Sequence, residues 1–240
     1  QFGGKIYFSP SYRSYGMNTI GCCYIEQMGK DTAYEGFNQN GLFAGVIALP
    51  TIKEEDRKLN PMTIHSLGMV KYILERASDV QESMSIDYRI KYGLPKVQYF
   101  FADNKANVGI YEEGVYEEIV KLNKGEYRLL TNQSVISKLG CSRYEKINGI
   151  LNRDEKIDEN LCFDILDKAK QEKLTAWTSV YNLYDLEFTL CLEQNFSTKY
   201  RINLNNNLKK GAHSIDFAEL KLNTRVINRK RNELYRKLDI

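Results

Sequence analysis

The first fifty residues alternate between short apolar runs and turn-forming residues. Residues 5–9 and 21–27 are rich in aromatic and β-branched side chains, and Pro10 and Ser11 follow the first run. Runs of this kind, bounded by turn residues, are typical of β-strands. Residues 42–49 are almost continuously apolar, which indicates a strand covered on both faces. This part of the chain is therefore predicted to form a covered sheet.

Between residues 60 and 92 the apolar positions change to helical spacing. Asn60 followed by Pro61 is a typical helix start, and apolar side chains recur with the period of a helix as far as Leu74. The segment Ser78–Gln81 fits a capping box, in which side chains bond the free N–H groups of the first turn. Two helices are therefore predicted after the first strands.

The remainder returns to strands, then helices, then strands. Strands are expected at residues 97–102, 108–111, 115–122, 176–183, 188–192 and 200–204, and helices at 144–151 and 161–171. Few of these elements form tight strand–helix–strand crossovers. The predicted fold class is therefore α+β, with two mainly antiparallel sheets flanked by helices in a single domain that spans residues 1–240.

Composition narrows the classes of protein that fit. Of 240 residues, 42% are hydrophobic and 27% charged, values of an ordinary globular chain, and no apolar run approaches the roughly 20 residues of a membrane span. Five cysteines without CxxC spacing argue against a disulfide framework and favour a reducing, cytoplasmic compartment. His65 and His213 are the only histidines and lie far apart, so neither a metal nor another cofactor is expected.

The C-terminal segment, residues 209–240, is basic, with nine Lys or Arg against four Asp or Glu. Such a segment can bind nucleic acid or an anionic surface. Its apolar residues are instead spaced as in an interrupted amphipathic helix with a solvated face, so a helical part of the same domain is expected and no nucleic-acid partner.

Four segments carry candidate chemistry. They are Glu35–Leu42, Tyr99–Asp103 with Gly109–Glu112, Leu130–Gln133 followed by Arg143, and Thr175–Leu183 around the single tryptophan. In this order and spacing they resemble the choloylglycine hydrolase and penicillin V acylase family of N-terminal-nucleophile hydrolases, over about residues 20 to 205. The resemblance implies an αββα sandwich.

The resemblance also implies an activity, hydrolysis of a linear amide C–N bond. A cysteine at the mature N-terminus attacks the amide carbonyl and its own α-amino group serves as the base. No such cysteine opens this chain, and Gln1 has no nucleophile, so the domain is expected to lack its first strands and nucleophile here. The implied substrate is an N-acyl amide of penicillin V-like or bile-salt-like type, and the implied assembly is a homo-oligomer, a tetramer. An inactive binding protein on the same fold and an acyltransferase stay open as alternatives.

Three residues match catalytic positions of the family. Asn132 matches the side-chain donor to the oxyanion, although an asparagine there can also simply close a turn. Ala48 matches the second donor, a backbone N–H, and lacks the side chain that reads bile salts in relatives. Arg143 matches the arginine that favours the thiolate, although a salt bridge is the commoner role of an arginine.

The remaining candidates have weaker roles. Ala48, Leu49 and Phe37 are the expected substrate contacts, with the hydrophobic core as the alternative for the apolar ones. Cys141, close to the Asn132 loop, is the one internal cysteine considered for a role, while Cys22 and Cys23 are expected to be buried. Asn38 and Asp103 are expected to hold turns and strand ends.

Overall fold

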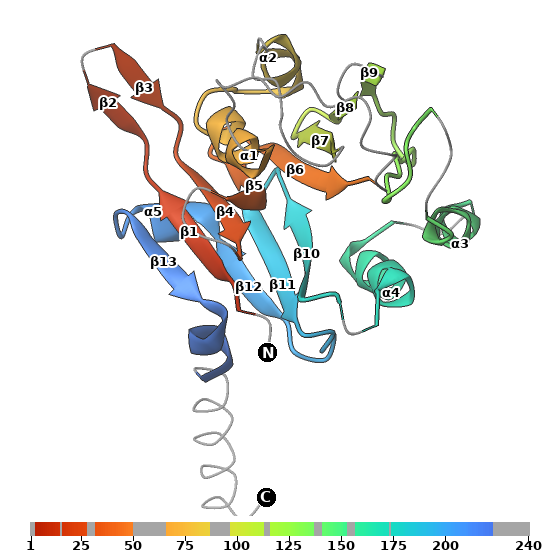
Figure 1. Cartoon of the computed structure of the whole chain (residues 1–240). Coiled ribbons are helices and arrows are strands. Elements are labelled where there is room, and N and C mark those ends of the chain that lie inside the picture. Colours follow the sequence, from red (N-terminus) through yellow and green to blue (C-terminus); the bar gives the residue numbers. More distant parts are fainter. Residues whose placement is uncertain are drawn as a thin grey trace, which may run out of the picture.

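A computed structural model describes residues 3–14, 16–27, 32–49, 66–86, 97–112, 116–136, 141–152, 157–172 and 174–222. Its largest element is an antiparallel sheet in which eight strands lie in the order β13-β1-β4-β5-β6-β7-β8-β9 (Figure 1). The bounds are β1 Lys5–Ser9, β4 Cys22–Glu26, β5 Ala33–Asn38, β6 Leu42–Ala48, β7 Val97–Asp103, β8 Asn107–Glu112, β9 Tyr116–Lys121 and β13 His213–Asp216. A small hairpin, β2 (Tyr12–Ser14) and β3 (Met17–Thr19), projects from it.

Two helices, α1 (Ser66–Leu74) and α2 (Val80–Ser85), cover one face of this sheet (Figure 1). Alternate residues of the strands point to this face because the side-chain period of a strand is two. Their aromatic members Tyr99 and Phe101 are fully buried against Met69 and Ile73 of α1. This packing makes the first core.

The other face packs on a second antiparallel sheet of order β10-β11-β12, with β10 Trp177–Asn182, β11 Glu187–Leu192 and β12 Tyr200–Asn203. Phe37 of β5 meets Phe188 of β11 at 5.8 Å between ring centroids, within a buried cluster that also holds Ile6 and Leu190. Helix α5 (Leu204–Leu208) closes this second core.

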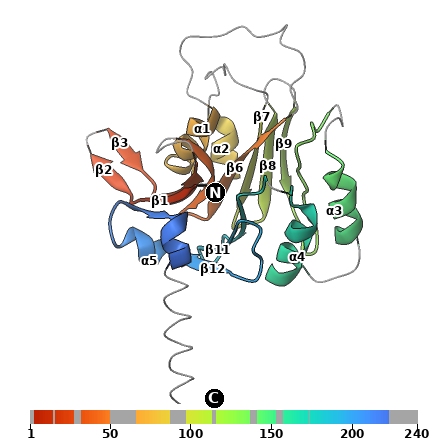
Figure 2. The same cartoon turned by 60° about the horizontal axis from the view of Figure 1, so that its bottom comes forward.

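Helices α3 (Arg143–Leu151) and α4 (Glu159–Ala169) pack on each other beside the second sheet (Figure 2). Ile147 and Ile165 form a small core between them. Helix α4 also contacts β10. The order of layers is therefore helix, sheet, sheet, helix, which is the sandwich that the sequence predicted.

Asn38 and Asp103 hold connections together, as expected. Asn38 is fully buried, and its Nδ2 donates to the carbonyls of Leu74 at 3.0 Å and Ala77 at 2.8 Å. Its Oδ1 accepts from the backbone N–H groups of Asn40 and Leu42. Asp103 accepts from the backbone of Lys105, Asn107 and Val80, which fixes the turn between β7 and β8 and the start of α2.

Two expectations from the sequence need correction. The capping box of α2 begins one residue later than predicted, because Asp79 is the N-cap and accepts from the N–H of Glu82, whose own carboxylate accepts from the N–H of Ser78. In the basic C-terminal segment, His213–Asp216 is a strand paired with β1, not a helix. Residues 217–222 are helical, and residues 223–240 lie outside the described part. The predicted start of the first helix at Asn60 also lies outside it.

Candidate active site

Asn132 lies between two other candidate residues. It belongs to the connection from β9 to α3, and its side-chain Nδ2 donates to the carbonyl of Ala48 at 2.6 Å, although the two residues are 84 positions apart. Its Oδ1 accepts from Nη2 of Arg143 at 2.6 Å. The structure thus brings together the three residues that the sequence singled out as catalytic.

Arg143 is the first residue of α3, a place where the dipole of its own helix disfavours a positive charge. Its guanidinium turns instead toward the end of α4, where Nη1 donates to the carbonyl of Ala169 at 3.3 Å. Carbonyls at a helix C-terminus lack intrahelical donors and attract cations. No carboxylate forms an ion pair with Arg143 within the described ranges. The arginine therefore serves the Asn132 loop and α4, not a salt bridge.

These contacts fix the orientation of the Asn132 amide. The oxygen must face Arg143, because a guanidinium only donates hydrogen bonds, and the nitrogen must face the carbonyl of Ala48, which only accepts. One N–H of the amide is used in this way, and the second has no partner among the described residues. A hydrogen bond from a cation to the amide oxygen also polarises the amide and strengthens its N–H donors. The half-buried Asn132 is thus a prepared donor beside the end of β6.

The three expected substrate contacts lie in different environments. Ala48 is exposed at the end of β6, whereas Leu49 is buried. Phe37 is fully buried between the two sheets, against Phe188 and Tyr181. Of the three, Ala48 is the one whose backbone is hydrogen-bonded to Asn132 among the described residues.

The guanidinium of Arg143 binds Cys141 as well as Asn132. Its half-buried Sγ accepts from Nε of Arg143 at 3.0 Å. Partial burial opposes ionisation of this thiol, but hydrogen bonds from the backbone and side chain of Arg143, together with its charge, outweigh burial and lower the pKa of Cys141. Burial first, and then the charges of Asp158 and Glu159, raise the pKa of Cys162.

This difference predicts selective alkylation. At pH 7 to 8 we expect iodoacetamide to modify Cys141 faster than Cys162, because the thiolate is the reacting form. Substituting Arg143→Met removes the side-chain donor and the charge but keeps the backbone N–H, so the pKa of Cys141 rises part of the way toward its ordinary value. Its labelling at pH 7 should therefore slow, and the labelling rates of parent and variant should converge at alkaline pH. Peptide mass spectrometry over a pH series measures both, and Cys162 is the internal control. An unchanged pH profile of Cys141 in the variant would contradict this account.

Glu35 is a half-buried acid whose partners the sequence did not reveal. Its carboxylate on β5 accepts from Nε1 of Trp177 at 2.9 Å, from the hydroxyl of Tyr181 at 3.2 Å and from the hydroxyl of Ser179. Burial raises the pKa of Glu35, and the three donated hydrogen bonds only partly offset this. The first and fourth candidate segments therefore meet across the two sheets. The one signal in the sequence was that Glu35 lies in the first candidate segment, and its three partners lie in the fourth.

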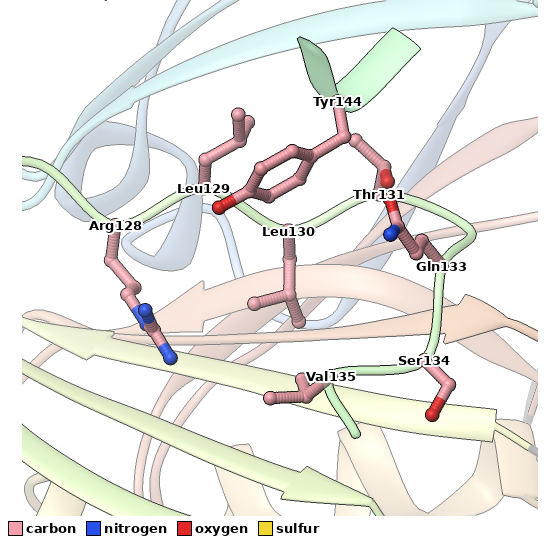
Figure 3. Close-up of a pocket in the computed structure, with 8 residues that line it drawn as sticks. All are labelled: Arg128, Leu129, Leu130, Thr131, Gln133, Ser134, Val135 and Tyr144. Atoms are coloured by element: carbon pink, nitrogen blue, oxygen red, sulfur yellow. The ribbon is translucent and has the colours of Figure 1, made fainter. Parts of the chain in front are cut away.

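A small cavity of about 30 Å³ lies beside the Asn132 loop, lined by Thr131, Gln133 and Tyr144 among others (Figure 3). This is room for water and not for an acyl group. A larger hollow of about 460 Å³ lies elsewhere, between the β10–β11 hairpin and the start of α4. Neither hollow is lined by Asn132, Arg143 or Ala48.

The described ranges hold neither a metal-binding cluster nor a membrane-spanning helix. No group of three or more His, Cys, Asp or Glu residues there is placed to hold a metal ion. None of the helices described is both long enough and apolar enough to span a membrane.

Solved structures share this fold. A variant of conjugated bile acid hydrolase from Clostridium perfringens aligns with a TM-score of 0.63 at 15% identity, over 90% of this chain and 89% of that chain. Penicillin V acylase from Agrobacterium tumefaciens aligns with a TM-score of 0.60 at 12% identity, over 85% of this chain and 79% of that chain. No family model and no curated protein matches the sequence. The chain therefore shares its fold with a conjugated bile acid hydrolase and a penicillin V acylase, and the predicted resemblance is confirmed at the level of fold.

Proposed function

We propose that this chain is the body of an amide hydrolase that cleaves linear C–N bonds in N-acyl substrates. Its nucleophile would be an N-terminal cysteine on a segment that precedes Gln1 in the natural protein. The observation that carries the proposal is the clamped amide of Asn132, held by Ala48 and Arg143 with one N–H left to donate. The shared fold with a bile acid hydrolase and a penicillin V acylase supports the same class of reaction.

The proposed chemistry is acyl transfer to sulfur and then to water. The α-amino group takes the thiol proton, the sulfur bonds to the amide carbonyl carbon, and the C–N bond breaks as the amine leaves with that proton. Water then attacks the thioester, which releases the acid and restores the thiol. In both steps negative charge develops on the carbonyl oxygen, where the free N–H of Asn132 and the backbone N–H of Ala48 would donate. Arg143 would keep the Asn132 amide oriented and favour the thiolate.

The proposed substrate class follows from the small apolar side chain of Ala48. Its methyl group supplies no side-chain hydrogen bond, so recognition at this position rests on shape and on backbone groups. We therefore propose a simple N-acyl amide, of penicillin V-like or bile-salt-like type, without assigning the acyl group. The proposed assembly is a homo-oligomer, as in the family.

The test begins with the natural full-length protein. Its mature N-terminus is determined by sequencing and intact mass, and a panel of N-acyl amino acids, phenoxyacetyl amides and bile-salt conjugates is assayed for release of free amine. We expect a cysteine at the mature N-terminus and turnover of at least one class. A mature chain that begins at Gln1, or the absence of turnover across the panel, would contradict the proposal and favour a non-catalytic binding protein.

The same assay separates hydrolysis from acyl transfer. A primary amine acceptor is added, and the acylated acceptor and the free acid are both quantified. Hydrolysis predicts that the acid remains the main product at millimolar acceptor. Dominant acylation of the acceptor would reassign the protein as an acyltransferase on the same site.

A further inference from the structure

Two buried polar residues of the large sheet hold the loop that carries Asn132. Gln98 of β7 and Glu112 of β8 are paired across the antiparallel strands. Gln98 is fully buried and Glu112 is 4% exposed. They alternate with Tyr99 and Tyr111, which face α1 and α2, so the pair faces the opposite side of the sheet.

Their hydrogen bonds reach the loop on both sides of Asn132. Nε2 of Gln98 donates to the carbonyl of Thr131 at 2.6 Å and to the carbonyl of Gln133 at 3.4 Å. Glu112 accepts from the hydroxyl of Ser134 at 2.8 Å and from the N–H of Val135 at 3.0 Å. This segment has no regular secondary structure, and Figure 3 shows it as a loop running over strands of the large sheet. Four hydrogen bonds from two sheet residues therefore determine where the Asn132 backbone lies.

Stability alone gives little reason for a glutamine at position 98. Its Oε1 has no hydrogen-bond partner among the described residues, and a buried polar atom without a partner is unfavourable for folding. Methionine has a similar length and volume and would bury no unpaired acceptor. Among the described residues, the hydrogen bonds of this side chain go to the two carbonyls that flank Asn132.

We propose that Gln98 and Glu112 are positioning residues that hold Asn132 in register with Ala48 and Arg143. This inference rests on the proposed function and adds to it a specific dependence of the rate on two residues that do not touch the substrate. Displacement of a catalytic group by about 1 Å can cost on the order of 100-fold in rate. Loss of the pair should therefore reduce kcat while KM, which reports contacts made elsewhere, changes little.

The test uses the full-length protein with Gln98→Met. We expect kcat to fall by roughly 10- to 100-fold with KM within about twofold, and amide hydrogen exchange of residues 129–136 to accelerate. Glu112→Gln is the second variant: its amide oxygen can still accept from the N–H of Val135, but its amide N–H can only donate to the Ser134 hydroxyl, a weaker pair of bonds than two to a carboxylate. Its kcat should fall by less than that of Gln98→Met.

Ser83→Ala is the matched control. Ser83 of α2 is also fully buried, and its hydroxyl donates to the backbone carbonyl of Asp79, the N-cap of that helix, on the helical side of the sheet. We expect a comparable loss of thermal stability without a change in kcat or in exchange of the loop. Crystal structures of Gln98→Met and Glu112→Gln test the displacement directly. In both, the distance from Nδ2 of Asn132 to the carbonyl oxygen of Ala48 should be longer than in the parent protein.

The outcomes separate this inference from the proposed function. If the parent protein hydrolyses amides and Gln98→Met leaves kcat or loop exchange unchanged, the positioning role is overturned and the proposed function stands. If the parent protein is inactive, the proposed function fails, while hydrogen exchange still decides whether the pair holds the loop. If Gln98→Met does not fold, an unchanged kcat and loop exchange in Glu112→Gln would overturn the role.

Discussion

Replacing Asn132 by alanine should reduce kcat by roughly 100- to 1000-fold with little change in KM, the loss seen when one side-chain donor to an oxyanion is removed. The amide is held by Arg143 and Ala48 before substrate arrives, so no reorganisation is needed as charge develops. Alanine removes the donor and leaves the cation. Steady-state kinetics on the substrate identified by the panel measures the effect.

Asn132→Asp makes the same test sharper. A carboxylate of the same shape can donate neither to an oxyanion nor to the carbonyl of Ala48, but it would form an ion pair with Arg143 in place of the present hydrogen bond. We therefore expect kcat to fall at least as far as in the alanine variant, while the ion pair keeps the melting temperature at or above that of the alanine variant. The control is Asn123→Ala, an exposed asparagine earlier in the same connection, which should retain full activity. Near-parental kcat in Asn132→Asp would remove Asn132 from the mechanism.

Replacing Asn38 by alanine should lower the free energy of unfolding by about 3–5 kcal/mol, because four backbone groups around this buried side chain lose their partners at once. Two of these groups are carbonyls at and beyond the end of α1, and two are N–H groups of the turn that leads into β6. For a chain of this length the melting temperature should fall by about 10 °C. Thermal and urea denaturation measure the change.

Asn195→Ala is the matched control for that substitution. Asn195 also makes several side-chain hydrogen bonds, to Ser197 and Thr198, but it lies on an exposed turn. Water can replace these bonds, so the expected loss is under about 1 kcal/mol. Equal losses at the two positions would mean that burial of Asn38 does not decide its contribution.

The strands that the sequence predicted well are those with a clear period and clear ends. Lys5–Ser9 forms β1 with the predicted bounds, and the apolar run after Gly41 forms β6. Strand β5 is not predicted, because Gly36 and Asn38 within it usually indicate turns and Glu35 is of a type depleted in strands. Gly36 is needed there, since a Cβ would lie 2.2 Å from the carbonyl oxygen of Cys23 on the neighbouring strand. Strand β13 was missed because basic residues surround it and its partner, β1, is some 200 positions away.

In the candidate site, too, contacts between distant parts of the sequence could not be predicted from local pattern. The association of Asn132, Arg143 and Ala48 could be predicted from ordered motifs, because a family resemblance places segments that local pattern cannot. Gln98 and Glu35 could not be predicted in their present roles. A single polar residue in an otherwise apolar strand indicates that a partner exists, but not which one, and the partners of Glu35 begin 142 positions later.

The separation of Asn132 from Ala48 along the chain also has a kinetic meaning. Their hydrogen bond joins residues 84 positions apart, and strands β7, β8 and β9 lie between them in sequence. Closing so long a loop costs entropy that only the intervening strand pairs can offset. During refolding, secondary structure should therefore form before the Asn132–Ala48 hydrogen bond does. In a stopped-flow experiment, the rate of amide hydrolysis should recover later than the circular dichroism signal.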